Sequence, residues 1–376
     1  MANAMSAGGD DSTALFSILP QAPVGMARLA AEATHADDGH LIEFKAMQAK
    51  SILNKSVSKR QLWMAYSINP YRGCEFGCKY CYARYTHEFL QPEPVPQIAP
   101  GNFEGPVQSW AVAFEREIYL KENAAWLLEQ ELKKIDPKEE IAIGTATDPY
   151  QPIERRMGIT RSILEVFAKS EGYRIGIVTK STLIARDADL LAEIAKKNKL
   201  AVHITITTTD SKLARILEPR APRPDLRFQT VKKLRAAGVR TGVLCSPLLP
   251  GITDNEAALD AVAARAKEAD ASFLAASPLF LKSCSRPMYL SFVREHFPHL
   301  IGEYEKRFAT MDFAEAGYKR KLAGMVTRVC AKHQLGERFT DALLTKDVGE
   351  GRARFTSKKG PAPVGWPMQA QALLFA

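Results

Sequence analysis

Residues 69–81 of this 376-residue chain read Asn-Pro-Tyr-Arg-Gly-Cys-Glu-Phe-Gly-Cys-Lys-Tyr-Cys. Cys74, Cys78 and Cys81 have the spacing C-x3-C-x2-C, which puts three thiols in one short loop. Thiolates select soft metals, namely zinc, copper(I) or the irons of an iron–sulfur cluster. Because a four-iron cluster normally takes four cysteines, three close cysteines would leave one iron open to a small molecule. The stretch therefore predicts an iron–sulfur site with an open coordination position.

A structural zinc site is the main alternative for this loop. His87 lies six residues after Cys81, so a site of three cysteines and one histidine is conceivable. Zinc knuckles usually open with C-x2-C, however, and no second pair of cysteines follows here. The other cysteines, Cys245, Cys284 and Cys330, are isolated, which is typical of a reducing cytoplasm rather than of a disulfide framework. Spacing alone favours iron–sulfur over zinc, and we expect a cytoplasmic protein.

The composition is that of a globular protein with a basic surface. Apolar residues make up 46% of the chain, and the formal net charge is +9. We expect no signal peptide and no membrane span, because no uncharged apolar stretch approaches the roughly 18 residues that a span needs. The basic residues gather at 45–60, 215–240 and 319–321. A basic face suits a polyanionic partner such as nucleic acid, although solvated helix faces would give the same pattern.

Short apolar runs alternate with tracts of helical period through the middle of the chain. We expect strands at residues 64–68, 141–146, 174–179, 201–207, 240–244 and 272–276. We expect helices between them at residues 110–134, 160–169, 185–197, 225–237 and 255–268. Strand–helix alternation implies a parallel sheet. The rhythm alone does not distinguish an open doubly wound sheet from an incomplete barrel.

The segments on either side of this core differ from it in composition. Residues 1–40 are rich in Ala, Gly, Asp and Ser, and we expect a mostly disordered leader there. The core with its lead-in is expected at 41–285, and a helical region at 286–350. Its helices, at 289–297, 300–308 and 313–331, would pack against the side of the sheet or cover its mouth. Residues 351–376 contain Ser-Lys-Lys-Gly-Pro-Ala-Pro and are expected to be a tail.

Tyr80 comes directly before the third cysteine and extends the motif to C-x3-C-x-(aromatic)-C. This pattern resembles that of the radical S-adenosylmethionine (SAM) enzymes. The resemblance implies that Cys74, Cys78 and Cys81 hold a 4Fe-4S cluster. It also implies that the open iron chelates the amino and carboxylate groups of SAM, and that Tyr80 lies beside the adenine.

The expected strands end in residues that suit SAM, and in parallel α/β folds ligands bind at these carboxyl ends. Lys180 can neutralise the carboxylate, and Gly144 lets the backbone approach a ligand closely. Asp148 and Glu218 can accept hydrogen bonds from the ammonium or the ribose, and Thr205 offers a hydroxyl. Each of these residue types is also common in ordinary loops, so the prediction of a cofactor site depends on their joint placement.

Residues 67–278 as a whole resemble the spore photoproduct lyase-related branch of the radical SAM superfamily. The segments that carry the resemblance are 69–84, Gly-Thr-Ala-Thr-Asp-Pro-Tyr-Gln-Pro-Ile-Glu at 144–154, Thr-Lys-Ser at 179–181, Glu-Pro-Arg-Ala-Pro at 218–222 and Pro-Gly-Ile-Thr-Asp at 250–254. The resemblance implies an α/β fold, a partial (β/α)6 barrel with the cluster at its mouth. An N-terminal extension and C-terminal helices lie outside it.

The reaction that the resemblance implies begins with reductive cleavage of SAM. A reduced cluster passes an electron to the sulfonium, which gives methionine and a 5′-deoxyadenosyl radical that abstracts hydrogen from the substrate. An electron donor of flavodoxin or ferredoxin type is implied, and DNA or RNA is the candidate substrate. The cofactor supplies the difficult chemistry, while the protein orients it and excludes water.

The resemblance is incomplete at the step that returns hydrogen to the product. Spore photoproduct lyases keep a cysteine after the second strand for this purpose, and Thr145 stands at that position here. The resemblance implies a lyase or repair-like reaction on nucleic acid, but threonine is a poor hydrogen-atom donor, so thymine-dimer repair itself stays open. Tyr80 and Tyr82 match the two tyrosines assigned to the relay in those enzymes. Tyr82 and Cys245 are therefore our candidate catalytic residues, although an isolated cysteine such as Cys245 is more often a buried apolar residue.

Two alternative functions remain open from the sequence. One is a tRNA- or protein-modifying radical SAM enzyme, and the other is a non-catalytic, metal-stabilised nucleic-acid-binding protein. Metal analysis and a SAM cleavage assay distinguish the second alternative from an enzyme.

Overall fold

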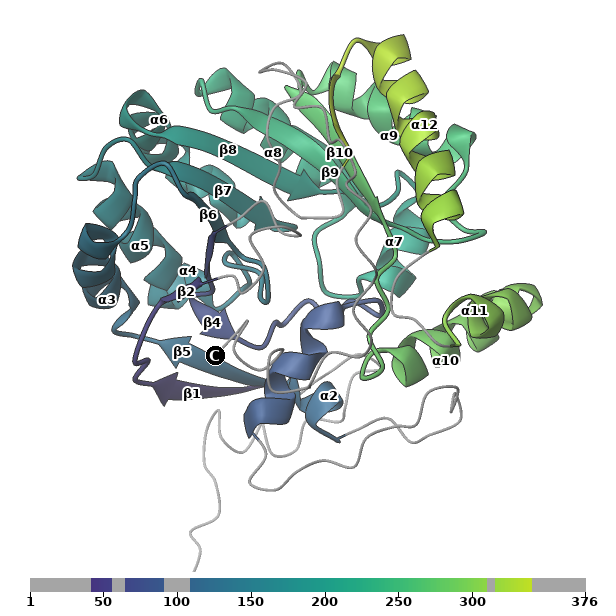
Figure 1. Ribbon diagram of the computed structural model, residues 1–376, viewed down its shortest axis with the longest axis horizontal. Helices are drawn as coiled ribbons and strands as arrows, with labels where there is room; N and C mark the ends of the chain where they lie inside the picture. The colour runs from purple at the N-terminus through teal and green to yellow at the C-terminus, as the bar shows by residue number, and fades with distance from the viewer. Residues whose placement is uncertain (1–41, 56–64, 91–108, 310–314, 340–376) are drawn as a thin grey trace, which may run out of the picture. The chain divides into compact units, whose positions relative to one another are not determined.

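A curved sheet of eight strands forms the centre of the fold (Figure 1). The computed structural model describes residues 42–55, 65–90, 109–309 and 315–339, so the expected leader and tail lie outside the described residues. Six strands run parallel, each paired with the next in chain order: β3 (Tyr66–Ile68), β6 (Glu140–Ile143), β7 (Arg174–Thr179), β8 (Lys199–Thr205), β9 (Thr241–Leu248) and β10 (Phe273–Pro278). The antiparallel β2 (Leu53–Lys55) and the parallel β11 (Gly336–Phe339) extend the two edges. This is the predicted partial (β/α)6 barrel with one strand added at each edge.

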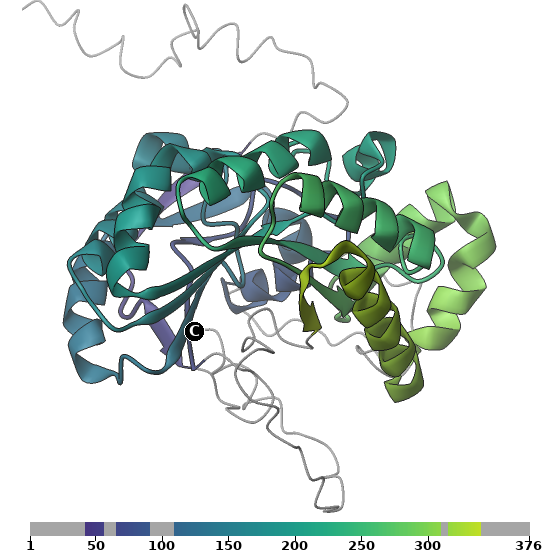
Figure 2. The ribbon, with the colours of Figure 1, turned by 90° about the horizontal axis from the view of Figure 1, so that it is seen from above.

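Helices cover the outer face of the sheet, as Figures 1 and 2 show. They are α3 (Ala124–Glu131), α5 (Ile159–Ala168), α6 (Ala188–Lys197), α8 (Pro224–Ala236), α9 (Glu256–Glu268) and α12 (Ala316–His333). Local chemistry sets their ends. The Asn255 side chain accepts a hydrogen bond from the Ala258 N–H and caps α9, while Pro224 occupies the first turn of α8. The helices predicted at 160–169, 185–197, 225–237 and 255–268 are confirmed, except that residues 183–187 form a short 3-10 helix, η3 (Leu183–Asp187).

The helix predicted at 110–134 is wrong in its middle. The segment forms α2 (Ser109–Ala113), β5 (Glu117–Lys121), α3 and the 3-10 turn η2 (Leu132–Lys134). β5 alternates between buried Ile118 and Leu120 and more exposed neighbours, which is the period of a strand. It pairs with β1 (Glu43–Met47) and with β4 (Tyr71–Arg72), in a second, three-stranded sheet. The sequence prediction followed local helical spacing and missed these partners, which lie far away in the chain.

The main core lies between the sheet and its outer helices, and a small cluster fills the inside of the barrel. Phe273 is the largest residue of that inner cluster, and its ring lies 4.9 Å from the His203 ring. Gly242, on the neighbouring strand β9, makes room for it, because a Cβ there would lie 2.4 Å from the Phe273 ring. The aromatic ring thus closes the inside of the barrel and leaves space at the carboxyl ends of the strands.

The C-terminal helices occupy both of the places that were left open by the sequence. α12 packs against α9 and β10 at the side of the sheet. α10 (Arg286–His296), the turn η4 (Pro298–Leu300) and α11 (Ile301–Arg307) share a hydrophobic cluster with Phe76, Cys78 and Tyr80 of the cysteine loop. Two further short elements flank that loop: η1 (Tyr82–Leu90) and α7 (Ser211–Leu217). Within the described residues, no helix is both long enough and apolar enough to cross a membrane.

Candidate active site

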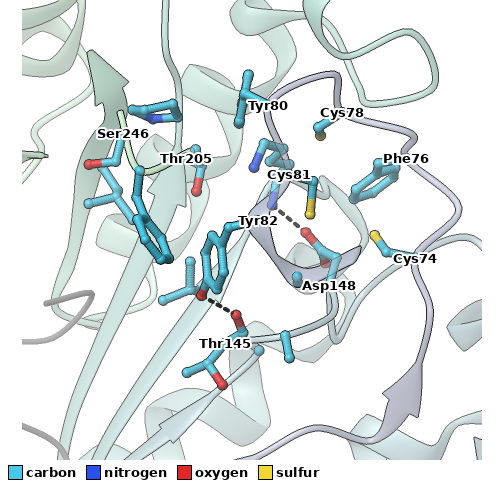
Figure 3. Close-up of a pocket in the computed structure, with 18 of the residues that line it drawn as sticks. Cys74, Phe76, Cys78, Tyr80, Cys81, Tyr82, Thr145, Asp148, Thr205 and Ser246 are labelled. Carbon is cyan, nitrogen blue, oxygen red and sulfur yellow. Dashed lines mark hydrogen bonds between the residues drawn. The ribbon is translucent and has the colours of Figure 1, made fainter. Parts of the chain in front are cut away.

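A cavity of about 290 Å³ lies at the carboxyl ends of the parallel strands (Figure 3). Every one of the six strands contributes to its wall, through the cysteine loop, residues 144–148, residues 178–180, Thr205, Leu244 with Ser246, and residues 277–280. All of the site residues predicted from the sequence line this cavity, except Glu218 and Cys245. The strand ends therefore bring together residues that are spread over some two hundred positions of the chain.

The cysteine loop, residues 74–81, brings all three thiols to one wall of the cavity. Cys74, Cys78 and Cys81 are free cysteines, and Figure 3 shows their sulfur atoms on the side of the cavity away from Ser246. Backbone bonds hold the loop: the Cys74 N–H donates to the Phe114 carbonyl at 2.9 Å, and the Lys79 N–H donates to the Leu217 carbonyl at 2.9 Å. The loop is therefore fixed on both sides by segments distant in sequence.

Burial makes two of these thiols, Cys74 and Cys78, hard to ionise. Burial raises the pKa of Cys78 to about 12, and burial together with Asp148 and the neighbouring thiols raises the pKa of Cys74 well above its ordinary value. At neutral pH Cys74 and Cys78 by themselves thus hold thiols rather than thiolates. Thiolate ligands form when a metal displaces the protons, so metal binding and deprotonation are coupled. Three soft donors from one loop, with free space beside them, fit the 4Fe-4S cluster that the spacing predicts.

His87, the fourth ligand in the zinc alternative, is held by another part of the fold. Its Nε2 lies 3.0 Å from the Glu117 carbonyl oxygen, and its ring packs edge-on against Phe114 and Tyr119. Burial lowers the pKa of His87 to about 4, so the ring is neutral. Within the described residues, no three or more His, Cys, Asp or Glu side chains are arranged to hold a single metal ion. His87 thus packs η1 onto β5.

Tyr80 is held from behind by a buried ion pair. Its hydroxyl donates to the Glu218 carboxylate, whose Oε2 lies 2.5 Å from Nη2 of Arg227. Burial alone would raise the pKa of Glu218, but Arg227 and Lys180 lower it below its ordinary value, so the group is ionised. Arg227 also donates to the Thr205 carbonyl at 3.0 Å. Glu218 therefore lies outside the cavity wall and fixes the aromatic side chain that lines it.

Lys180 is the cation of the cavity wall on the side of the cysteines. Its ammonium lies 5.6 Å from the centre of the Tyr80 ring, within the range of a cation–π contact. Burial alone would lower the pKa of Lys180, but Cys78 in its thiolate form and Glu218 raise it above its ordinary value. The backbone N–H of Lys180 donates to Asp148 Oδ2 at 2.7 Å. An ammonium at this point is ready to meet an anionic ligand group.

Asp148 and Gly144 stabilise the loop that follows β6. Asp148 Oδ1 accepts hydrogen bonds from the Thr179 hydroxyl at 2.6 Å and from the Tyr150 N–H at 2.9 Å, so its carboxylate joins two strand ends. Gly144 has φ +90°, and a Cβ there would lie 2.6 Å from the Val178 carbonyl oxygen. Both residues line the cavity, but contacts within the protein already account for their chemistry.

Comparison with known proteins agrees with this geometry. The family model described as the radical SAM superfamily matches residues 68–261, which include the cysteine loop and most of the barrel. This chain belongs to the radical SAM superfamily. An uncharacterized protein of Mycobacterium tuberculosis is 31% identical over 295 residues, which cover 78% of this chain and 82% of that protein. An uncharacterized protein of Methanocaldococcus jannaschii is 32% identical over 191 residues, or 51% of this chain and 63% of the relative.

Solved structures share the radical SAM fold. Spore photoproduct lyase complexed with dinucleoside spore photoproduct has a TM-score of 0.58 at 13% identity and covers 87% of this chain and 88% of its own. A mutant of the same enzyme with bound AdoMet and dinucleoside spore photoproduct has a TM-score of 0.54 at 12% identity, with coverages of 86% and 87%. The likeness confirms the predicted fold. This protein is a radical SAM enzyme, and enzymes of this superfamily use a 4Fe-4S cluster and SAM.

Tyr82 reaches the middle of the radical SAM cavity. Its hydroxyl donates to the Thr145 carbonyl oxygen at 2.5 Å, as the dashed line in Figure 3 shows, and its ring lies 5.6 Å from the Phe280 ring. The Thr145 hydroxyl accepts a hydrogen bond from Asn69 Nδ2 at 3.2 Å. The predicted tyrosine and the threonine at the lyase cysteine position are therefore in direct contact.

Cys245 is not brought to the cavity. Its neighbours Leu244 and Ser246 line the wall, and because strand residues alternate between faces, Cys245 points to the other face, into the core beneath the helices. Its Sγ lies 3.7 Å from the Thr207 carbonyl oxygen, and burial raises its pKa to about 12.

The structure adds two groups of site residues that we did not assign from the sequence. Ser246 and Ser277 line the far wall, with their hydroxyl oxygens 2.8 Å apart, and Phe280 and Lys319 also line the cavity. A Ser-Pro pair ends both β9 and β10, which was a usable signal. Arg227, which holds Glu218 from helix α8, had no such sequence signal, because an arginine within a helix usually indicates a solvated face.

Proposed function

We propose that this radical SAM enzyme binds its cluster through Cys74, Cys78 and Cys81 and cleaves SAM reductively in the adjoining cavity. The observation that carries the proposal is that these three thiols share one cavity wall with Tyr80 and an ammonium group, that of Lys180. When bound, the cluster and SAM would supply an electron and a 5′-deoxyadenosyl radical for hydrogen abstraction from the substrate. The protein's own task is to hold, orient and shield these groups.

Four residues of the wall would orient SAM. The Lys180 ammonium would pair with the carboxylate, and Thr205 would offer a hydroxyl from the end of β8. Tyr80, held rigidly by Glu218, would present its ring to the adenine. Gly144 would contribute only backbone atoms to this wall, because a Cβ there would meet the Val178 carbonyl oxygen rather than a ligand. Asp148 and Glu218 would act through Lys180 and Tyr80 rather than as direct ligands, which revises the direct role that the sequence suggested for them.

Anaerobic reconstitution with iron and sulfide tests the proposal. We expect about four irons per chain, and methionine with 5′-deoxyadenosine after reduction with dithionite in the presence of SAM. A protein that takes up zinc and no iron under these conditions would contradict the proposal. That result would favour the alternative of a non-catalytic, metal-stabilised nucleic-acid-binding protein.

We propose nucleic acid as the substrate class. The chain carries a net charge of +9, Lys319 adds a cation to the cavity wall, and spore photoproduct lyase, the structural neighbour, was solved with a dinucleoside bound. Binding of single-stranded DNA and RNA oligonucleotides should weaken linearly on a log–log plot as salt rises. Preference for RNA would favour a tRNA-modifying enzyme. If the protein binds neither DNA nor RNA at low salt, the proposal is contradicted and a peptide substrate is favoured.

The two candidate hydrogen donors give opposite predictions. Tyr82 lines the cavity, and Cys245 points away from it, so we expect Cys245→Ala to keep both SAM cleavage and product formation. Tyr82→Phe keeps the ring but removes the hydroxyl. We expect this variant to cleave SAM as before but to form less product for each SAM consumed. Quantifying 5′-deoxyadenosine and product for both variants checks this. Loss of product in Cys245→Ala alone would restore Cys245 as the donor.

A further inference from the structure

Three charged side chains meet behind the cysteine loop, on the side away from the cavity. Nη2 of Arg84 lies 3.1 Å from Glu115 Oε2, and Nη2 of Arg220 lies 3.2 Å from the same oxygen. Arg84 is fully buried and Glu115 almost so, with 0% and 8% of their side chains exposed, while Arg220 is 16% exposed. We call Arg84, Glu115 and Arg220 the arginine clamp. None of its members lines the cavity, so no step proposed above uses them.

Both arginines of the clamp also hold the cysteine loop directly. Arg84 Nη2 donates to the Cys78 carbonyl at 3.1 Å, and Arg220 Nε donates to the Glu75 carbonyl. Arg84 Nη1 reaches the Ala111 carbonyl at 2.7 Å. Each guanidinium has donors in a rigid fork, so it can bond a carbonyl and a carboxylate together. One carboxylate, on Glu115, thus fixes the orientation of two forks that support the loop between Cys74 and Cys78.

The loop sequence is fitted to the clamp at Gly77. This residue has φ +63°, and a Cβ on it would lie 2.5 Å from Arg220 Nη2 and 2.5 Å from Glu115 Oε2. The clamp therefore occupies the space that any other side chain at this position would need. A side chain at Gly77 would displace the ends of Arg220 and Glu115, and its backbone conformation by itself favours glycine.

The clamp carries more positive than negative charge and contacts the backbone of the cysteine loop. Two guanidiniums face the Glu115 carboxylate, and Arg220 also acts on the Glu75 carboxylate, in a setting from which water is largely excluded and where charges act more strongly than in solvent. Reduction adds one negative charge to a cluster, so nearby positive charge favours the reduced form. Glu115 offsets part of that positive charge, and removing it would make a cluster easier to reduce.

We infer that Glu115 is a positioning residue that, through Arg84 and Arg220, holds the cysteine loop in place before the cluster is inserted and lowers the reduction potential of the cluster. The inference rests on the proposed function, in which Cys74, Cys78 and Cys81 carry that cluster. Its two parts have separate readouts, one in the cluster-free protein and one in the reconstituted protein.

Redox titration of two variants tests the electrostatic part. Glu115→Gln keeps the shape of the side chain and removes its charge, and we expect about a tenfold higher ratio of reduced to oxidised cluster at a fixed potential, equivalent to about 59 mV for one electron. Arg220→Met removes a positive charge, and we expect a shift of the opposite sign. If the substitutions act only by loosening the loop, the reduction potentials of both variants should shift in the same direction. That result, or an unchanged reduction potential in both variants, would overturn the inference.

The cluster-free protein tests the positioning part. We expect Glu115→Gln and Arg220→Met both to speed alkylation of the loop cysteines by a neutral reagent, because the loop loses its support. Glu117→Gln is the matched control, since Glu117 pairs with Lys45 at the surface, and we expect native rates from it. Native rates in both clamp variants would overturn this part. If the native protein binds no iron, the proposed function is wrong. If the variants bind iron but their clusters keep the native reduction potential, only this inference is wrong.

Discussion

Replacing Cys78 with serine is expected to leave the protein without a stable cluster and to lower reductive SAM cleavage by more than roughly 100-fold, because even an outer-shell change at a metal site costs 10–100-fold in affinity. Cys78 is buried on the cavity wall, and a serine hydroxyl there is a harder, weaker donor to iron than a thiolate. Iron per chain, visible absorbance and 5′-deoxyadenosine yield after anaerobic reconstitution measure the loss.

Cys330→Ala provides the control for this experiment. Cys330 is equally buried but lies on α12 in the main core, outside the cavity. We expect this variant to take up native amounts of iron. If Cys78→Ser and Cys330→Ala retain the same iron content, the cysteine loop is not the metal site.

Replacing Arg227 with alanine is expected to cost about 3–5 kcal/mol of unfolding free energy, since it leaves the Glu218 carboxylate buried without its partner. Both side chains of this pair are almost completely buried, with 1% and 0% exposed. Urea denaturation of the cluster-free protein measures the change. The double variant Arg227→Ala with Glu218→Gln should recover part of the stability, because it removes the unpaired charge.

Arg223→Ala is the matched control for Arg227→Ala. Arg223 also pairs with an acid, Asp225, but its side chain is 63% exposed. Water screens that pair, so we expect no measurable change in stability. Equal effects of the two substitutions would contradict the role given to the buried pair.

The same buried pair makes a prediction about acid. The pKa of Glu218 lies below its ordinary value in the folded protein, so its contribution to stability is present above the pKa of an unfolded glutamate and is lost as the pH falls through the folded pKa. In Arg227→Ala burial would raise the pKa of Glu218, so the stability difference between native protein and this variant should narrow as the pH falls from neutral to below about pH 4. A difference that stays constant from neutral to acidic pH would contradict an ionised Glu218.

Local sequence was sufficient for the alternating strands and helices and for the cysteine loop. Strand β7 has the predicted bounds, because a β-branched run between turn residues is a local signal. The barrel itself followed from the family resemblance and not from the rhythm. β5 was missed because its strand character depends on pairing with β1, more than seventy residues earlier.

The site could be predicted as a set of residues but not as a set of roles. Lys180 and Tyr80 lie in the cavity as expected, whereas Glu218 lies behind Tyr80, 138 residues away in sequence, and acts on it rather than on a ligand. Arg220 meets the Glu75 carbonyl across 145 positions. Contacts of this length follow from how the chain returns to the barrel mouth, and a single sequence contains no local sign of them.

The helical cover of the cysteine loop has a consequence for the order of assembly. Ser285 Oγ donates to the Cys81 carbonyl at 2.6 Å from 204 residues further along, and Tyr289 of α10 belongs to the same hydrophobic cluster as Cys78. During synthesis the thiols leave the ribosome long before the segment that shields them, and chains begin to fold from the N-terminal side. The nascent protein thus passes through a stage in which the cysteine loop has been made and is still uncovered, and in the function proposed above, delivery of iron and sulfide at that stage needs no reopening of the finished fold.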